Sequence, residues 1–264
     1  MQWIRILLEE NYPMKISFTN KQWISAAAVV VLLLIWKLLA VCFDSGFVVP
    51  HPEKTLLMVG KLFVDKDFAS IIGSTVFRGM LGFACSFVLG MALGIVAGIS
   101  PGFQAFLNPI LVTIRSVPVI SLILLALIWL SPGSVPVFIA MLTMFPFICT
   151  NVIEGIKSVD PDLIGMARFY KIHPGRIVRE VYIPAILPFI ISGTSSAMGI
   201  GWRAIIIGEV LSQPTYGIGT MMQSAQTFLN VEAVIAWTLI AVVISTLFEW
   251  LIRWTEKRML TWKN

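Results

Sequence analysis

Four ionisable side chains lie inside or beside otherwise apolar stretches, and these are the positions where chemistry is expected. Arg115, Arg203 and Glu209 fall within such stretches, and Arg78 lies near the end of one. A charge in hydrocarbon is costly, so it faces protein or a water-filled path. We expect Arg78 to anchor its helix at the membrane interface. Glu209 could gate a path, pair with an arginine or join two copies of the chain.

The stretch that carries Arg203 is also rich in small polar residues, which suit a translocation path between two copies better than a lipid-facing surface. The guanidinium groups of Arg115 and Arg203 favour a small anion as the solute. Pro118 follows Arg115 by three residues and frees a backbone carbonyl that could line the same path. The residues predicted to border the path are Arg115, Pro118, Ser195, Ser196, Trp202, Arg203 and Glu209.

Motifs for enzymatic chemistry are missing from the sequence. There is no G-x-x-x-x-G-K-[ST] segment to bind nucleotide phosphates and no H-E-x-x-H or G-x-S-x-G motif. His51 and His173 fall in loops predicted on opposite sides of the membrane, and the three cysteines have no metal-ligand spacing. We expect no catalytic residue, bound metal or cofactor on this chain. If transport uses ATP and Mg, a separate ATPase subunit must bind them.

The composition identifies the elements that hold these residues as membrane helices. Hydrophobic residues make up 58% of the 264 positions and charged residues 12%, against about 25% charged in soluble domains. Apolar runs of about 20 residues predict an all-α polytopic protein. The predicted spans are 23–43, 73–99, 107–130, 135–156, 188–211 and 234–252. They form a domain over 23–252, with an N-terminal segment 1–22, a loop 157–187 and a C-terminal tail 253–264.

The distribution of lysine and arginine predicts the orientation. Twelve of these residues fall before the first span, in the loop 157–187 or after the last span, and only three fall in the opposite loops. Cytoplasmic loops carry the excess of positive charge, so both termini are expected in the cytoplasm. The net charge of +5 is explained by this bias, and we expect membrane lipid rather than nucleic acid as the partner.

The second span carries a small residue at every fourth position: Gly82, Ser86, Gly90, Gly94 and Gly98. Such a stripe allows another helix to approach backbone to backbone. It predicts a helix-packing seam and does not identify the partner helix.

A short helix is predicted within the loop between the fourth and fifth spans. Asp160 can accept a hydrogen bond from the first turn, Pro161 suits the first helical position, and Asp162 adds negative charge at the positive helix end. The helix should end before Pro174-Gly175. A basic stretch follows, and Pro184 and Pro188 mark the return to the membrane.

This loop resembles the EAA loop of the permease subunits of binding-protein-dependent ABC importers. Aligned on Ala167, the end of that pattern falls on Val181, Ile183 and Pro184, whereas its Glu, first Ala and Gly are Gly165, Met166 and Lys171 here. The segments SVDPDL, PAILPFIISG, IRSVPVISLILLALIW and GWRAIIIGEVL are similar to the nitrate/taurine/aliphatic-sulfonate branch of the family. The resemblance covers about residues 48–258.

The resemblance implies a type I importer permease (MetI-like) fold in the inner membrane of a bacterium. It also implies a second permease copy, two ABC ATPase subunits and a periplasmic or lipid-anchored substrate-binding protein. The solute would be a sulfonate, nitrate or vitamin precursor. The implied ATPase-coupling residues are Asp160, Pro161, Asp162, Leu163, Met166, Ala167, Arg168, Tyr170, Lys171 and Pro184. The alternative is a self-sufficient secondary transporter, which would be expected to show an internal repeat.

Overall fold

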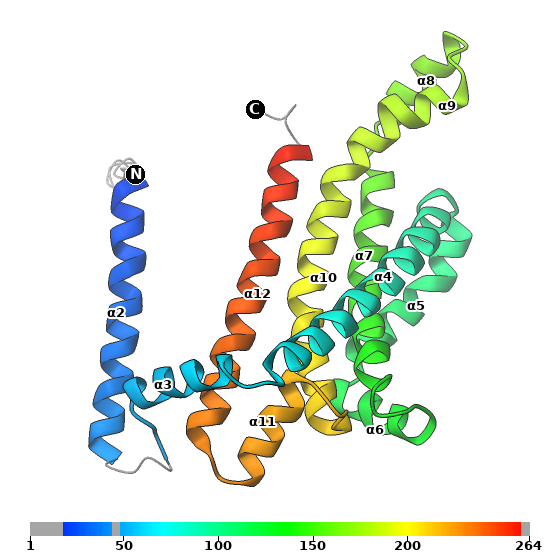
Figure 1. Cartoon of the computed structure of the whole chain (residues 1–264). Helices are drawn as coiled ribbons and strands as arrows, with labels where there is room; N and C mark the ends of the chain where they lie inside the picture. The colour runs from blue at the N-terminus through cyan, green and yellow to red at the C-terminus, as the bar shows by residue number, and fades with distance from the viewer. Residues whose placement is uncertain (1–17, 44–47, 260–264) are drawn as a thin grey trace, which may run out of the picture.

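The computed structural model describes residues 18–43 and 48–259, and in these ranges every regular element is a helix (Figure 1). Most of the predicted segment 1–22 and the end of the tail 253–264 lie outside the described residues. The long helices are α2 (Phe18–Phe43), α4 (Phe68–Ile99), α7 (Val135–Lys157), α10 (Ile183–Ser212) and α12 (Val231–Met259).

Shorter helices join the long ones. They are α3 (Pro52–Phe63), α5 (Pro101–Ser116), α6 (Val119–Trp129), α8 (Pro161–Phe169), α9 (Pro174–Ile177) and α11 (Ile218–Thr227). A π-helical turn, Val178–Tyr182, continues α9 into α10. The helices α8 and α9 form a hairpin that projects beyond the bundle (Figure 1).

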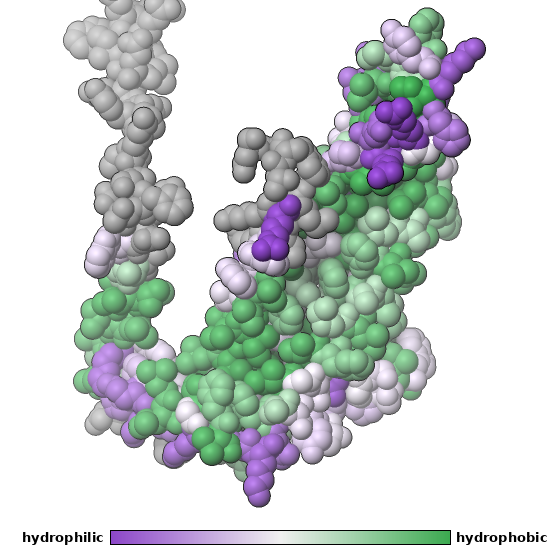
Figure 2. Space-filling view, turned by 45° about the horizontal axis from the view of Figure 1, so that its top comes forward, coloured by the Kyte–Doolittle hydropathy of each residue, from purple (hydrophilic) through white to green (hydrophobic). Residues whose placement is uncertain are grey.

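The surface has the pattern of a protein embedded in lipid. Five helices in the described ranges are long and apolar enough to cross a membrane, and the bent pair α5–α6 brings the number to six. Figure 2 shows apolar residues over the middle of the bundle and hydrophilic residues gathered toward its two ends. The predicted fold class, an all-α membrane protein with about six spans, is confirmed.

One predicted span differs from the structure. The range 107–130 is not a single helix, because α5 and α6 meet at an angle of 97°. Between them Val117 has extended backbone angles, φ −71° and ψ 130°. Pro118 is the cause: it donates no backbone hydrogen bond and disfavours helical geometry at the residue before it. The average hydropathy of the segment does not reveal this break in the helix.

The stripe of small residues on α4 packs against α7. A Cβ atom added at Gly90 would lie 2.8 Å from the side chain of Ile148, and one added at Gly94 would lie 2.8 Å from Val152. The Ser86 hydroxyl donates to the carbonyl of Met141 across the same contact, at 2.9 Å. Larger side chains would separate the two helices, so the seam depends on glycine for close backbone contact.

The helix α2 stands apart from the bundle and is joined to it through α3 (Figure 1). Two contacts fix this corner: the Trp36 indole donates to the carbonyl of Pro50 at 3.1 Å, and Lys37 pairs with Glu53 at 2.6 Å. The Lys37 ammonium lowers the pKa of the exposed Glu53 carboxyl by hydrogen bonding. Most of the α2 surface is exposed.

Candidate translocation path and coupling hairpin

A groove of about 390 Å³ between α10 and α12 gathers four of the residues predicted to border the path. Ser195, Ser196, Trp202 and Arg203 all line it from α10. The Trp202 side chain forms the wall: it is 4% exposed, its indole donates to the carbonyl of Ala241 at 3.1 Å, and its ring packs against Phe248. The hydroxyls and the guanidinium are left to face the opening.

The facing helix α12 supplies polar groups that the sequence reasoning missed. Ser245 and Glu249 line the groove opposite Arg203. They are four positions apart, which puts them on one face of a helix. Polar residues spaced four positions apart within an apolar span are the sequence signal by which these two groove residues could have been found. The groove therefore presents hydroxyls, a cation and a carboxylate along one face of two long helices.

Arg115 and Pro118 are not among the residues that line this groove. The Arg115 guanidinium donates to the carbonyl of Pro146 at 2.7 Å and to the hydroxyl of Thr150, and it lies 5.1 Å from the ring centre of Phe147. Arg115 thus binds α5 to α7, and Pro118 begins α6 at the bend. The structure does not bring these two residues together with Arg203.

Glu209 is the centre of a buried hydrogen-bond network at the opposite end of the bundle from α8. Its side chain is 0% exposed and pairs with Arg78 at 2.7 Å. It also accepts from the Thr75 hydroxyl and from the Gly219 backbone N–H, each at 3.0 Å. Thr75 and Arg78 belong to α4 and Gly219 to the first turn of α11, so one carboxylate joins α4 and α11 to α10.

The same network holds the loop 213–217 that connects α10 to α11. The Arg78 guanidinium donates to the carbonyl of Tyr216 at 2.7 Å, and the Thr75 hydroxyl accepts from the backbone N–H of Ile218 at 2.9 Å. A Cβ atom added at Gly217 would lie 2.6 Å from the Glu209 carboxyl carbon. Glycine is needed there for this close approach.

These contacts show how the structure places the two charged residues whose roles were predicted above. Arg78 was expected to anchor its helix at the membrane interface; in the structure its side chain is only 13% exposed and its charge is paired with Glu209. Of the three roles considered for Glu209, pairing with an arginine is the one the structure contains. Its burial keeps the carboxylate away from the groove that holds Arg203, and Glu209 is not among that groove's lining residues.

The α8–α9 hairpin has a small apolar core of its own. Ile164, Ala167 and Ile177 are buried together, with Val181 and Tyr182 packed against them. At the start of α8 the Asp160 carboxylate accepts from the backbone N–H of Asp162 at 2.8 Å. Ala167, which the resemblance aligned with the EAA pattern, thus faces inward and helps to hold the hairpin together.

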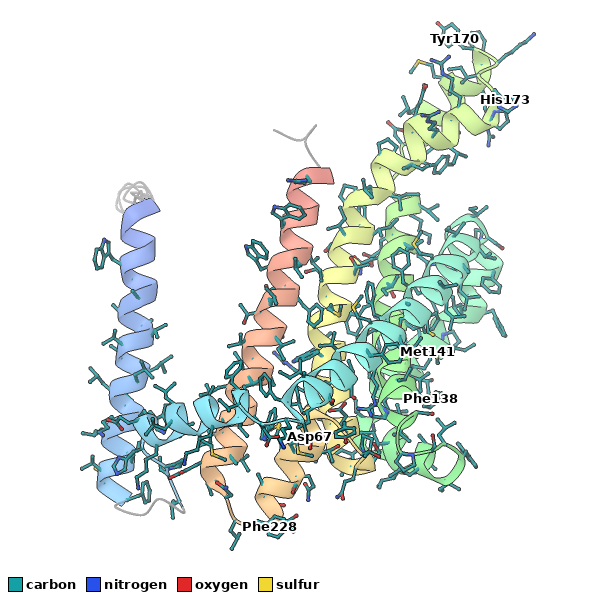
Figure 3. All side chains as sticks on the ribbon, viewed as in Figure 1. Asp67, Phe138, Met141, Tyr170, His173 and Phe228 are labelled. Atoms are coloured by element: carbon teal, nitrogen blue, oxygen red, sulfur yellow. The ribbon has the colours of Figure 1, made fainter. Side chains whose placement is uncertain are left out.

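The opposite face of the hairpin is apolar and exposed. Phe169 is 82% exposed and meets Tyr170 edge to face, with ring centres 5.6 Å apart. Leu163 and Met166 are exposed on the same helix. Tyr170 and His173 lie at the tip of the hairpin, far from Phe228 at the other end of the molecule (Figure 3). An exposed apolar cluster of this kind is typical of an interaction surface.

Lys171 ends α8 in a left-handed conformation, with φ at 54°. The backbone N–H of Ile172 donates to the carbonyl of Ala167 at 3.0 Å, and that of Lys171 donates to Arg168 at 2.9 Å. This pair of bonds is the Schellman motif, which normally uses glycine at the left-handed position. The position is also the one where the EAA pattern carries its glycine.

We expect Lys171→Gly to stabilise the hairpin by about 1 kcal/mol, because a side chain in the left-handed region is strained by roughly that amount. Hydrogen exchange of the α8 amides should slow correspondingly. The control is Arg168→Gly, which introduces glycine inside α8 and should speed exchange. Equal behaviour of the two variants would contradict the role given to the left-handed turn.

Residues 90–261 match the family described as binding-protein-dependent transport system inner membrane component. The chain belongs to this family. The match covers α7, the α8–α9 hairpin and both helices of the groove, whereas Thr75 and Arg78 of the buried network lie before it.

Relatives of the permease carry names that specify solutes. It is 28% identical over 246 residues to the taurine transport system permease protein TauC of Escherichia coli (strain K12), covering 90% of this chain and 89% of that protein. It is 27% identical over 209 residues to the nitrate import permease protein NrtB of Synechocystis sp., covering 75% of each. These proteins align over most of their length.

The fold of the permease also matches a solved transporter. A chain of the MetNI methionine ABC transporter superposes with a TM-score of 0.59 at 17% identity, covering 72% of this chain and 93% of that one. The predicted MetI-like architecture is therefore confirmed at the level of the fold. No finding supports the alternative of a self-sufficient secondary transporter.

Proposed function

We propose that the permease works as one half of a dimeric pore, that a separate ATPase drives it through the α8–α9 hairpin, and that it imports a small anion. The observation that carries the proposal is the exposed apolar face of the capped hairpin that leads into the start of α10. The helix α9, the π-turn and α10 form one continuous helical stretch over residues 174–212. A displacement of the hairpin would therefore be transmitted along α10 to the groove. ATP and Mg would bind the partner.

The orientation of the chain is part of this proposal. The hairpin, the start of α2 and the end of α12 lie on one side of the molecule (Figure 1), which supports both termini in the cytoplasm. Lys54, Lys61 and Lys66 belong to α3 and the turn after it, at the other side. A substrate-binding protein would dock there, outside the cell.

The solute class is inferred from the groove. Its one cation, Arg203, is exposed, and the carboxylate of Glu249 lines the same groove from α12. A guanidinium and neighbouring hydroxyls suit the planar or tetrahedral oxygens of a nitrate or a sulfonate. The relatives named for taurine and nitrate transport support this class. Two copies would meet with their α10–α12 grooves facing one another.

We expect Arg203→Gln to reduce uptake of the transported anion by about tenfold or more, because a hydrogen bond to a charged group contributes about 1.5–3 kcal/mol. The apparent KM should rise, and the basal ATPase rate of the complex should be unchanged. The control is Arg203→Lys, which keeps the charge and should retain more uptake. Uptake at the wild-type level in Arg203→Gln would exclude Arg203 from the path.

The test of the whole proposal is reconstitution. The permease should co-purify with an ABC ATPase, and the complex in liposomes should hydrolyse ATP faster when a substrate-loaded binding protein is present outside. Taurine, an alkanesulfonate and nitrate are the solutes to compare. Solute uptake by the permease alone, without any ATPase, would contradict the proposal and favour a secondary transporter.

A further inference from the structure

A second groove, entirely apolar except for one tyrosine, lies at the end of the bundle nearest the hairpin. It has a volume of about 430 Å³ and is formed by the last turns of α4 and α7, by the π-turn and by the start of α10. Its lining includes Ile95, Val152, Tyr182 and Ile186. The volume falls within the roughly 300–1,000 Å³ of small-molecule sites.

The groove faces away from the proposed path. Ile190 lines the apolar groove and Gly199 lines the polar one. The two residues are nine positions apart on α10, which is about two and a half turns of an α-helix. The two grooves therefore lie on opposite faces of α10. A second copy that met this chain across the polar groove would leave the apolar groove open.

The groove lies at the ends of two membrane-spanning helices. Ile99 is the last residue of α4, and Ile156 is the last but one of α7. Both line the groove, so it begins where the spans leave the hydrocarbon. Proteins leave few voids of this size unfilled. In the bilayer the surrounding solvent is lipid, so we expect lipid to fill an apolar groove that opens to it.

Polar groups at the mouth fit a phospholipid head group. Tyr182 lines the groove at its hairpin end, and tyrosine concentrates at the level of the head groups. Arg179 is exposed and lies beside Val178, which also lines the groove. The other arginine of this segment, Arg176, is paired with Glu180 at 2.9 Å. Arg179 is thus the cation available for a phosphate.

We propose that this groove binds one acyl chain of a phospholipid whose phosphate contacts Arg179 and the Tyr182 hydroxyl. The lipid chain would lie between the π-turn and the ends of α4 and α7. Any influence of the bound lipid on coupling depends on the function proposed above for the hairpin. Occupancy of the groove by lipid does not depend on it.

Native mass spectrometry of the full chain, released from nanodiscs containing equal amounts of phosphatidylglycerol and phosphatidylethanolamine, tests the proposal. The wild type should retain phospholipid, and Ile95→Trp, which fills the groove, should lose it. The matched control is Val88→Trp, on the same face of α4 two turns away and not among the lining residues; it should retain the lipid. Retention by Ile95→Trp at the wild-type level would overturn the proposal.

Three further variants test the head group and the competing occupant. Arg179→Gln should reduce the preference for the anionic phosphatidylglycerol by about fivefold, the amount expected for one basic residue near the membrane surface, whereas Arg176→Gln should not. Disulfide formation between two copies of an Ile95→Cys variant would show that protein covers the groove and would overturn the lipid assignment. Neither readout involves ATP or uptake, so failure here leaves the proposed import function standing.

Discussion

Replacing Arg78 with alanine is expected to destabilise the folded permease by about 3–5 kcal/mol, which is the cost of leaving one partner of a buried ion pair uncompensated. The carboxylate of Glu209 is fully buried and would keep only the Thr75 hydroxyl and the Gly219 N–H as donors. The loop that Arg78 holds through Tyr216 would lose a second contact. Unfolding in a graded series of denaturing detergent measures the change.

The control for this prediction is the exposed pair of Arg176 and Glu180 on the hairpin. Arg176→Ala should change stability by no more than about 0.5 kcal/mol, because solvent screens an exposed pair. Arg78→Ala combined with Glu209→Gln should recover part of the loss, since no charge is then left buried. If Arg78→Ala were as mild as Arg176→Ala, the network would not be holding the three segments together.

Replacing Phe169 with glutamate is expected to abolish co-purification of the ATPase and, with it, uptake. Burying a phenylalanine side chain contributes about 1.5–3 kcal/mol, and a carboxylate placed in the same contact would be desolvated without a partner. The stability of the permease itself should be unchanged, because Phe169 is 82% exposed. Co-purification, vesicle uptake and thermal unfolding are measured on the same preparation.

Phe228→Glu is the matched control for this change, because Phe228 is 80% exposed and lies at the other end of the molecule (Figure 3). It should leave the ATPase bound. Ala167 is a poor probe of docking by comparison: it is buried in the hairpin core, so a large side chain there would disrupt the hairpin whether or not a partner binds. Normal ATPase binding by Phe169→Glu would show that the exposed face is not the docking surface.

The sequence was sufficient to predict the long membrane helices and the capped start of α8. Runs of apolar residues indicate burial in lipid whichever helix is the neighbour. Asp160-Pro161 is a local signal for the start of a helix. The polar groove was also within reach, since small polar residues on α10 were visible along one stretch. Ser245 and Glu249 could have been added from their spacing on α12.

The ion pair could not be predicted from local patterns. Arg78 and Glu209 are 131 positions apart, and only the packing of α4 against α10 brings them together. The bend at Val117–Pro118 had a local signal in the proline, but the average hydropathy of the segment outweighed it. The strained turn at Lys171 was missed for a different reason: lysine has no preference for the left-handed region, so its type gives no indication of that geometry.

The separation of Arg78 and Glu209 along the chain has a consequence for biogenesis. Translation at about 5–20 residues per second takes roughly 7–26 s to reach Glu209 after Arg78 has been made. Throughout that interval the nascent helix α4 carries a cation whose counterion does not yet exist. Arg78 is the eleventh residue of α4, and its long side chain can extend toward water until α10 arrives. A ribosomal product that stops short of residue 209 would lack the carboxylate that neutralises Arg78.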